Sequence, residues 1–270
     1  MVEKHPRLQQ TLYSLSSEPD PVFPVPGEEE PSQSTSPLPI LTLLLVWATL
    51  AFHYNSSPLY RKSLFRYFTG HAFFLSDIFR QHIRSPLPAL VIIIQNALLT
   101  AALAFTIAVS FWSETGLHSL IYHFPGLFLI SGGEYDIFIA FFGFTLVFSL
   151  TGILWLYFSY TSIVSVTQIM TIFAWPLQVN ILLGSFAIAM QISGGHATIT
   201  ALLAGLLLLV WLGSFVMAAL DASRSLPEKR LRYIGVTAGL YLVVLAGLSI
   251  WLLEFNDPLW QVVGLSLALK

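Results

Sequence analysis

The sequence predicts an all-α protein: a polytopic transmembrane helical bundle of about six spans with one in-plane amphipathic helix. Of the 270 residues, 56% are hydrophobic and only 10% are charged, whereas a soluble domain usually carries about 25% charged residues. No Lys, Arg, Asp or Glu lies between Asp136 and Asp221. Long apolar runs recur along the chain, and about 20 helical residues are enough to cross the ~30 Å hydrocarbon core of a bilayer.

The first segment, residues 1–37, is acidic and proline-rich and contains the run Glu28, Glu29 and Glu30. A segment of this composition cannot bury enough apolar surface to offset the entropy lost when it becomes ordered. We therefore expect a disordered tail over residues 1–37, followed by a transmembrane bundle over residues 38–254.

Six apolar runs make up the predicted bundle. The first is the shortest and lies at the lower limit for a span, so a segment that only dips into the bilayer remains an alternative there. The last stretch, residues 255–270, is too short to cross and is expected at the interface or packed on the bundle. The predicted spans are residues 38–54, 87–112, 137–160, 165–190, 197–220 and 234–253.

Two groups of basic residues predict the orientation. One group lies between the first two spans and the other between the last two, and the four crossings that separate them put both on the same side. Lys and Arg concentrate in cytoplasmic loops, so residues 55–86 and 221–233 are predicted to be cytoplasmic in a bacterial inner membrane, with both termini outside. The basic residues concerned are Arg61, Lys62, Arg66, Arg80, Arg84, Arg224, Lys229, Arg230 and Arg232.

The segment from Tyr60 to Arg84 has apolar residues at helical spacing with basic residues between them, and Gly70 is placed to divide it into two helices. Such a segment lies in the membrane plane, with its rings in the acyl boundary and its cations toward anionic headgroups. We favour a simple anchoring elbow, and a docking surface for a partner or lipid is the alternative.

The fourth span carries Pro176 near the predicted midplane, ~16 Å from the cytoplasmic end. Gln178 and Asn180 follow it, and the second span carries Gln95 and Asn96 at an overlapping depth. One interpretation is that these amides hydrogen-bond across helices and absorb the proline kink. The other is a polar cavity that binds a small ligand. We favour the first, because transporters usually add an ionisable residue at such depth and no predicted span has one deep inside it.

The sixth span contains a GxxxG pair, Gly235 and Gly239, and Gly247 lies two turns further along the same face. Small residues let helix backbones approach closely. A homodimer seam and packing within the chain both fit this pattern, and packing within the chain is the commoner use.

No enzymatic motif is present: the sequence lacks HExxH, GxSxG, a Walker loop and a Rossmann glycine pattern. It has no cysteine, which excludes thiolate metal sites and cysteine nucleophiles. The predicted topology gathers His118, His123 and His196 on the outer side with Glu134 and Asp136, but their spacing matches no metal-ligand pattern. We therefore expect no enzyme activity, no cofactor and no metal site. The net charge of −2 also suggests no nucleic-acid partner.

The layout resembles two membrane families. The basic aromatic elbow "YRKSLFRYFTGHAFFLSDIFRQHIR" and the late basic turn "LDASRSLPEKRLRY" are similar to an uncharacterised six-span family of Bacteroidetes-type bacteria, over Pro39 to Phe255. The proline-and-amide helix "VTQIMTIFAWPLQVN" is similar to Yip1-like proteins, over Arg61 to Leu253, although these have five spans. The first resemblance supplies no catalytic residues. The second implies a non-enzymatic scaffold that binds partners through its cytoplasmic face.

The sequence as a whole favours a non-enzymatic integral membrane protein that acts as a scaffold or accessory subunit of a membrane complex. Its expected partners are the lipid bilayer and other membrane proteins. A small-solute transporter with a polar site around Pro176 is the alternative. A third class is a membrane enzyme with a metal site on the outer side.

Overall fold

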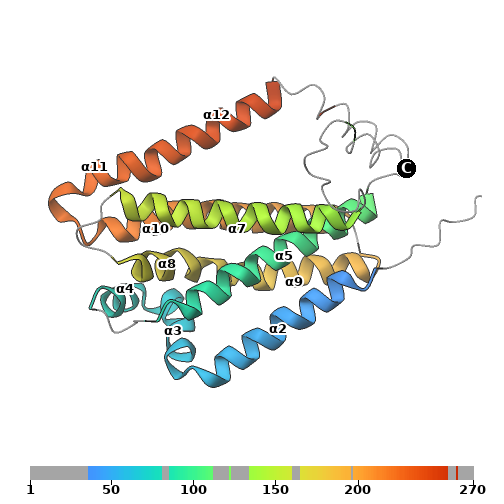
Figure 1. The fold of residues 1–270 in the computed structure, drawn as a ribbon, viewed down its shortest axis with the longest axis horizontal. Helices are drawn as coiled ribbons and strands as arrows, with labels where there is room; N and C mark the ends of the chain where they lie inside the picture. Colours follow the sequence, from blue (N-terminus) through green and yellow to red (C-terminus); the bar gives the residue numbers. More distant parts are fainter. Residues whose placement is uncertain are drawn as a thin grey trace, which may run out of the picture. The chain divides into compact units, whose positions relative to one another are not determined.

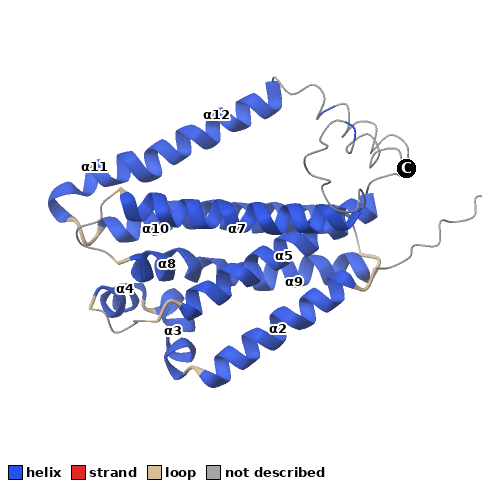
Figure 2. Ribbon diagram, viewed as in Figure 1, coloured by secondary structure: helices blue, strands red, loops and turns tan. Residues whose placement is uncertain are grey.

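The structure, a computed structural model, describes residues 36–80, 85–111, 122, 134–159, 165–195, 197–254 and 260. These residues form helices joined by short turns, and no β-strand occurs among them (Figure 2). Six of the helical segments are long and apolar enough to cross a membrane. The predicted all-α fold is therefore confirmed, and the chain is a multi-pass integral membrane protein.

The six candidate spans follow one another in the predicted order (Figure 1). The first has 19 residues, which at 1.5 Å each gives a helix of about 28 Å, close to the thickness of the hydrocarbon core. The fourth and sixth spans are each composed of three helical pieces. The spans are α2 (Leu38–Ser56), α5 (Leu87–Phe111), α7 (Glu134–Phe158), α8 (Val166–Ala174) with η3 (Trp175–Leu177) and α9 (Gln178–Ile192), α10 (Ala197–Ser223), and α11 (Arg230–Ile234) with η5 (Gly235–Gly239) and α12 (Leu240–Glu254).

The second and fourth spans form the centre of the bundle. Their windows are 61% and 67% buried, against 17 to 28% for the other four spans. Small residues allow this close packing: Ala97 and Ala101 of α5 are fully buried, and a Cβ added at Gly184 of α9 would lie 3.2 Å from Leu207 and 3.4 Å from Leu99. Helix α5 packs against α2, α7 and α9, while α10 packs against α8 and α9.

Two short helices, α3 (Pro58–Thr69) and α4 (His71–Phe79), form the elbow between the first two spans. Ser57 caps the start of α3, and its hydroxyl accepts a hydrogen bond from the backbone N–H of Tyr60. Gly70 caps the end of this helix. The predicted division at Gly70 is therefore confirmed.

The elbow is amphipathic, but its buried side faces the protein. Tyr60, Tyr67, Phe74, Leu75 and Ile78 are buried in the bundle core. Phe65, Phe68 and Phe73 remain exposed on the other side. The tyrosines and Phe74 therefore pack on protein and not in the acyl boundary where rings of this segment were expected, and that expectation stays a prediction for the exposed aromatic residues.

Candidate functional site

Pro176 lies within a continuous helical span, one turn of which has 3-10 geometry. A capping box fixes the start of α8: the Ser165 hydroxyl accepts from the N–H of Gln168, and the Gln168 Oε1 atom accepts from the N–H of Ser165 at 2.7 Å. The proline ring has no N–H to donate, and the α-helical pattern gives way to a 3-10 turn over Trp175–Leu177 before it resumes at Gln178. The proline is therefore accommodated by a local change to 3-10 geometry within the span.

The four amide side chains around this turn have different partners. Asn180 of α9 donates from Nδ2 to the Oδ1 atom of Asn96 on α5 at 2.8 Å, and both residues are completely buried. Gln95 points elsewhere: its Nε2 atom donates to the hydroxyl of Thr49 on α2 at 2.9 Å and also reaches the carbonyl of Val46 at 3.3 Å. The Nε2 atom of Gln178 is buried without a hydrogen-bond partner among the described residues.

Each of these amides keeps one polar atom unpaired. The unpaired atoms are Gln95 Oε1, Asn96 Nδ2, Gln178 Nε2 and Asn180 Oδ1, all buried and without a hydrogen-bond partner in the described part of the chain. A buried polar atom without a partner costs about 1–3 kcal/mol. The cluster therefore retains buried donors and acceptors that no other described residue satisfies.

A second polar site, which was not predicted from the sequence, lies at the end of α10. Helix α10 continues through Ser223, so Asp221 belongs to this span and not to the cytoplasmic loop in which it was expected. Its Oδ1 atom lies 2.9 Å from Nε2 of His71 on α4 and 3.7 Å from Nε of Arg224. These partners allow a carboxylate that is only 2% exposed to occupy the last turn of a span.

The environment of Asp221 also affects Tyr67. Burial, and the negative charge of Asp221 nearby, raise the pKa of the Tyr67 phenol above its usual value, so this phenol stays neutral at physiological pH. The backbone carbonyl of Tyr67 lies 3.3 Å from Nδ1 of His71. Both ring nitrogens of His71 therefore contact oxygen atoms. A lone aspartate directly after an apolar run, with a histidine in a loop predicted to be on the same side, was the available signal in the sequence.

Two further long-range hydrogen bonds hold the elbow on the bundle. The indole N–H of Trp175, in the 3-10 turn, donates to the carbonyl of Ser63 at 3.2 Å. Gln168 donates from Nε2 to the carbonyl of Ile78 at 2.9 Å. The Trp175 ring also contacts Phe74, with ring centroids 5.5 Å apart. The unusual proline-tryptophan pair thus forms part of the surface on which α3 and α4 rest.

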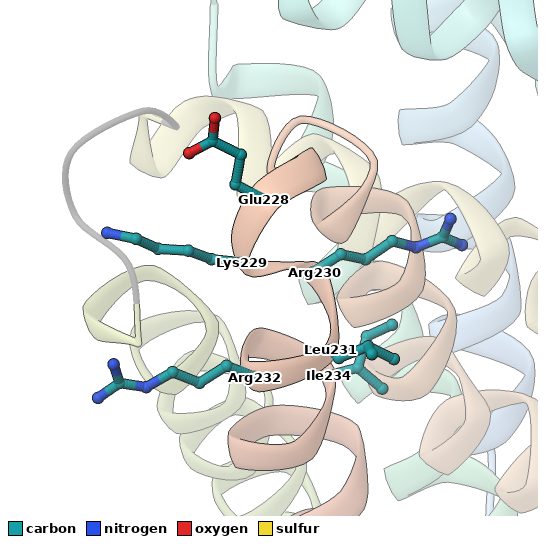
Figure 3. Close-up of a pocket in the computed structure, with 6 residues that line it drawn as sticks. All are labelled: Glu228, Lys229, Arg230, Leu231, Arg232 and Ile234. Atoms are coloured by element: carbon teal, nitrogen blue, oxygen red, sulfur yellow. The ribbon is translucent and has the colours of Figure 1, made fainter.

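The predicted basic residues fall into separate groups. Arg66 pairs with Asp77 within the elbow, Arg224 lies beside Asp221, and Arg84 is outside the described residues. Arg61, Lys62 and Arg80 are exposed on α3 and at the end of α4. The remaining group lines a surface pocket of about 660 Å³ at the start of the sixth span, formed by Glu228, Lys229, Arg230, Leu231, Arg232 and Ile234 (Figure 3).

The glycines of the sixth span are open to their surroundings. A Cβ added at Gly235 or Gly247 would meet no heavy atom within 4 Å outside its own helix, and one added at Gly239 would meet only the carbonyl oxygen of Ile234, at 3.6 Å. The expected packing of this face within the chain is therefore not seen among the described residues. The reason is that α12 contacts α7 and α10 near its start, where Tyr241 is buried, and diverges from them further along the chain (Figure 1).

The candidate metal ligands of the outer side, His118, His123 and His196, lie outside the described residues. Within the described ranges, no group of three or more His, Asp or Glu residues is placed to hold a metal ion. The C-terminal segment, residues 255–270, is likewise outside the described part of the chain except for Trp260.

Comparison with known proteins adds no relative: no protein-family model, curated protein or solved structure matches this chain.

Proposed function

We propose that this multi-pass membrane protein is a non-enzymatic scaffold or accessory subunit of a membrane complex, and that α12 is the span that contacts the partner. The observation that supports this proposal is the exposure of α12. Of its 15 residues only Tyr241 is buried in the chain, and apolar side chains are exposed all around it, among them Leu242, Val243 and Trp251.

An exposed apolar helix can be covered by lipid alone. The glycines of the sixth span therefore provide the evidence for a protein neighbour in place of lipid. Glycine lowers helix stability by about 1 kcal/mol relative to alanine. The sixth span nevertheless has Gly235, Gly239 and Gly247, with little or nothing from the rest of the described chain packed against them. A flat face of this kind suits the close approach of another helix backbone. A second transmembrane helix is therefore a better occupant for this face than acyl chains.

The proposed orientation puts the basic residues in the cytoplasm of a bacterial cell, with the chain in the inner membrane. The His71–Asp221 contact holds α4 against the end of α10, so the described parts of the two basic regions meet there. That arrangement is the one expected if both regions follow the positive-inside rule. The resemblance to Yip1-like proteins implies the same kind of non-enzymatic role and remains an expectation.

A glycine substitution with a matched control tests the proposal. Gly247→Leu adds a side chain to the face of α12 proposed to meet the partner, whereas Gly205→Leu adds the same side chain to α10, where a new Cβ also meets no heavy atom within 4 Å. We expect both variants to unfold at the wild-type temperature in mild detergent. Only Gly247→Leu should lose the partner that co-purifies with the wild-type protein.

Cross-linking identifies the occupant directly. A photoreactive residue at Val243 should give a protein adduct in native membranes, and the same residue at Phe144, exposed on α7, should not. The mass of the adduct tells a second copy of this chain from a different protein. Adducts with lipid only at Val243, or equal protein adducts at Val243 and Phe144, would contradict the assignment of α12.

A small-solute transporter is the second candidate, and the four unpaired amide atoms around Pro176 favour it. Gln178→Leu combined with Asn180→Leu separates the two functions. A scaffold with these substitutions stays folded and keeps its partner. A transporter stays folded but loses the uptake of small uncharged solutes into proteoliposomes. Loss of uptake with an unchanged partner would favour the transporter over the scaffold.

A further inference from the structure

We propose that the pocket at the start of the sixth span binds the phosphate headgroup of an anionic phospholipid. Lys229 and Arg232 would hold the headgroup, and the exposed apolar residues of η5 and α12 would contact its acyl chains. This inference goes beyond the scaffold role, because it assigns a ligand to a surface that needs no partner protein.

The charge of the pocket matches a phosphate. Three of its six lining residues are basic, Lys229, Arg230 and Arg232, and one is acidic, Glu228. Lys229 and Arg232 extend to the same side of the chain, Glu228 lies beyond Lys229 on that side, and Arg230 extends to the opposite side (Figure 3). The planar guanidinium of an arginine binds phosphate oxygens in pairs, and a lysine ammonium adds a point charge.

The position of the pocket also matches a headgroup. The sixth candidate span begins at Arg230, so the basic residues lie where that span enters the membrane. At the cytoplasmic surface, each cation near anionic lipid contributes about 1 kcal/mol of attraction. Leu231, which is 85% exposed, and Ile234 belong to the same pocket. A phospholipid presents charge and acyl chains together, and this pocket offers partners for both.

The apolar surface continues from the pocket into the membrane. Val236 and Leu240 are exposed along η5 and the start of α12, beyond Arg232 at successive spacings of four residues. Free phosphate would use only the charged residues and leave this surface unused. The continuity therefore favours a phospholipid over a soluble phosphate.

Hydrogen bonds to neighbouring helices hold the start of the sixth span, where the pocket lies, in place. The hydroxyl of Tyr233, between Arg232 and Ile234, donates to the carbonyl of Leu156 on α7 at 3.1 Å, and Tyr233 is buried. The hydroxyl of Tyr241 donates to the carbonyl of Leu212 on α10 at 3.2 Å. The base of the span is thus held to α7 and α10, while the rest of α12 is exposed.

Binding of defined lipids to the purified full-length protein tests this site. Phosphatidylglycerol should raise the unfolding temperature in detergent and appear as a bound lipid in native mass spectrometry. Phosphatidylcholine with the same acyl chains, and inorganic phosphate, should do neither. Lys229→Gln with Arg232→Gln should weaken the apparent affinity for phosphatidylglycerol roughly 30-fold, because two cations are lost.

The matched control removes the same two charges from α3. Arg61 and Lys62 are exposed at the same end of the bundle, and Arg61→Gln with Lys62→Gln should leave the affinity for phosphatidylglycerol within about twofold of wild type. Because all four side chains are exposed, both double variants should fold; single variants of Lys229 and Arg232 repeat the test with half the change in charge. An equal loss in the control pair, an equal shift with phosphatidylcholine, or a full shift with inorganic phosphate would overturn the proposal.

Discussion

Single polar side chains determine how the helices of this bundle are joined. Asn96 and Asn180 meet between α5 and α9, and Gln95 reaches α2. The sequence predicted their depth, because depth follows from counting residues along a helix. It did not predict their partners, because adjacent positions on one helix point to different neighbours: Gln95 and Asn96 bond to different spans.

The Asn96–Asn180 hydrogen bond should contribute a small and measurable coupling to stability. We expect Asn96→Leu and Asn180→Leu each to lower the free energy of unfolding, because each leaves the other amide without its partner. The free energy of unfolding of the double variant should fall by about 0.6 kcal/mol less than the sum of the two single losses. This difference is the average contribution of interhelical bonds of this kind. A double-mutant cycle in detergent or bicelles measures this coupling, and additive losses would show that the bond contributes nothing.

The Asp221–His71 contact should hold α4 on the bundle more strongly than the surface pair of the elbow does. Asp221→Ala should increase amide hydrogen exchange in α4 about tenfold, because a hydrogen bond to a charged group in a buried place contributes about 1.5–3 kcal/mol. Asp77→Ala removes the exposed pair with Arg66 and should change exchange little, since such pairs contribute about 0–1 kcal/mol. Faster exchange after Asp77→Ala than after Asp221→Ala would contradict this ranking.

At the scale of elements, the fourth span and the elbow act as one unit. The sequence predicted both segments, and it placed Gly70 correctly between α3 and α4. It did not predict that they pack together, because Tyr60 and Tyr67 have the same amphipathic character whether they face lipid headgroups or a tryptophan. The π-helical turn η5 over Gly235–Gly239 was also not predicted, since nothing in "GVTAG" distinguishes it from an ordinary helical turn.

Trp175→Phe tests the connection between the 3-10 turn and α3. The substitution keeps an aromatic ring but removes the indole N–H, which leaves the carbonyl of Ser63 without this donor. We expect a loss of about 1 kcal/mol in unfolding free energy and faster hydrogen exchange in α3. Trp47→Phe is the control, because the bond of Trp47 to Ser185 is on the exposed side of α2. If Trp47→Phe lowered the unfolding free energy as much as Trp175→Phe or more, the 3-10 turn would not support the elbow.

At the scale of the whole molecule, polarity explains which spans are central. The fourth span is the one with the proline and two midplane amides, and its window is 67% buried; the sixth has neither and is only 17% buried. Polar groups avoid lipid, so the amide-bearing helices α5 and α9 pack inside the bundle and the mostly apolar α12, which has no amide side chain, remains outside. The number and order of the spans could be predicted from the lengths of the apolar runs alone. The exposure of α12 could not, because lipid-facing and partner-facing helices have the same composition.

The most direct test of the central claim is the side of the membrane on which the two basic regions lie. The natural chain has no cysteine, so Lys62→Cys and Lys229→Cys each introduce a single thiol, one in each region. In intact cells neither thiol should react with a membrane-impermeant maleimide, and both should react after the inner membrane is permeabilised. Reaction of either one in intact cells would contradict the proposed topology, and reaction of only one would contradict the six-span bundle itself.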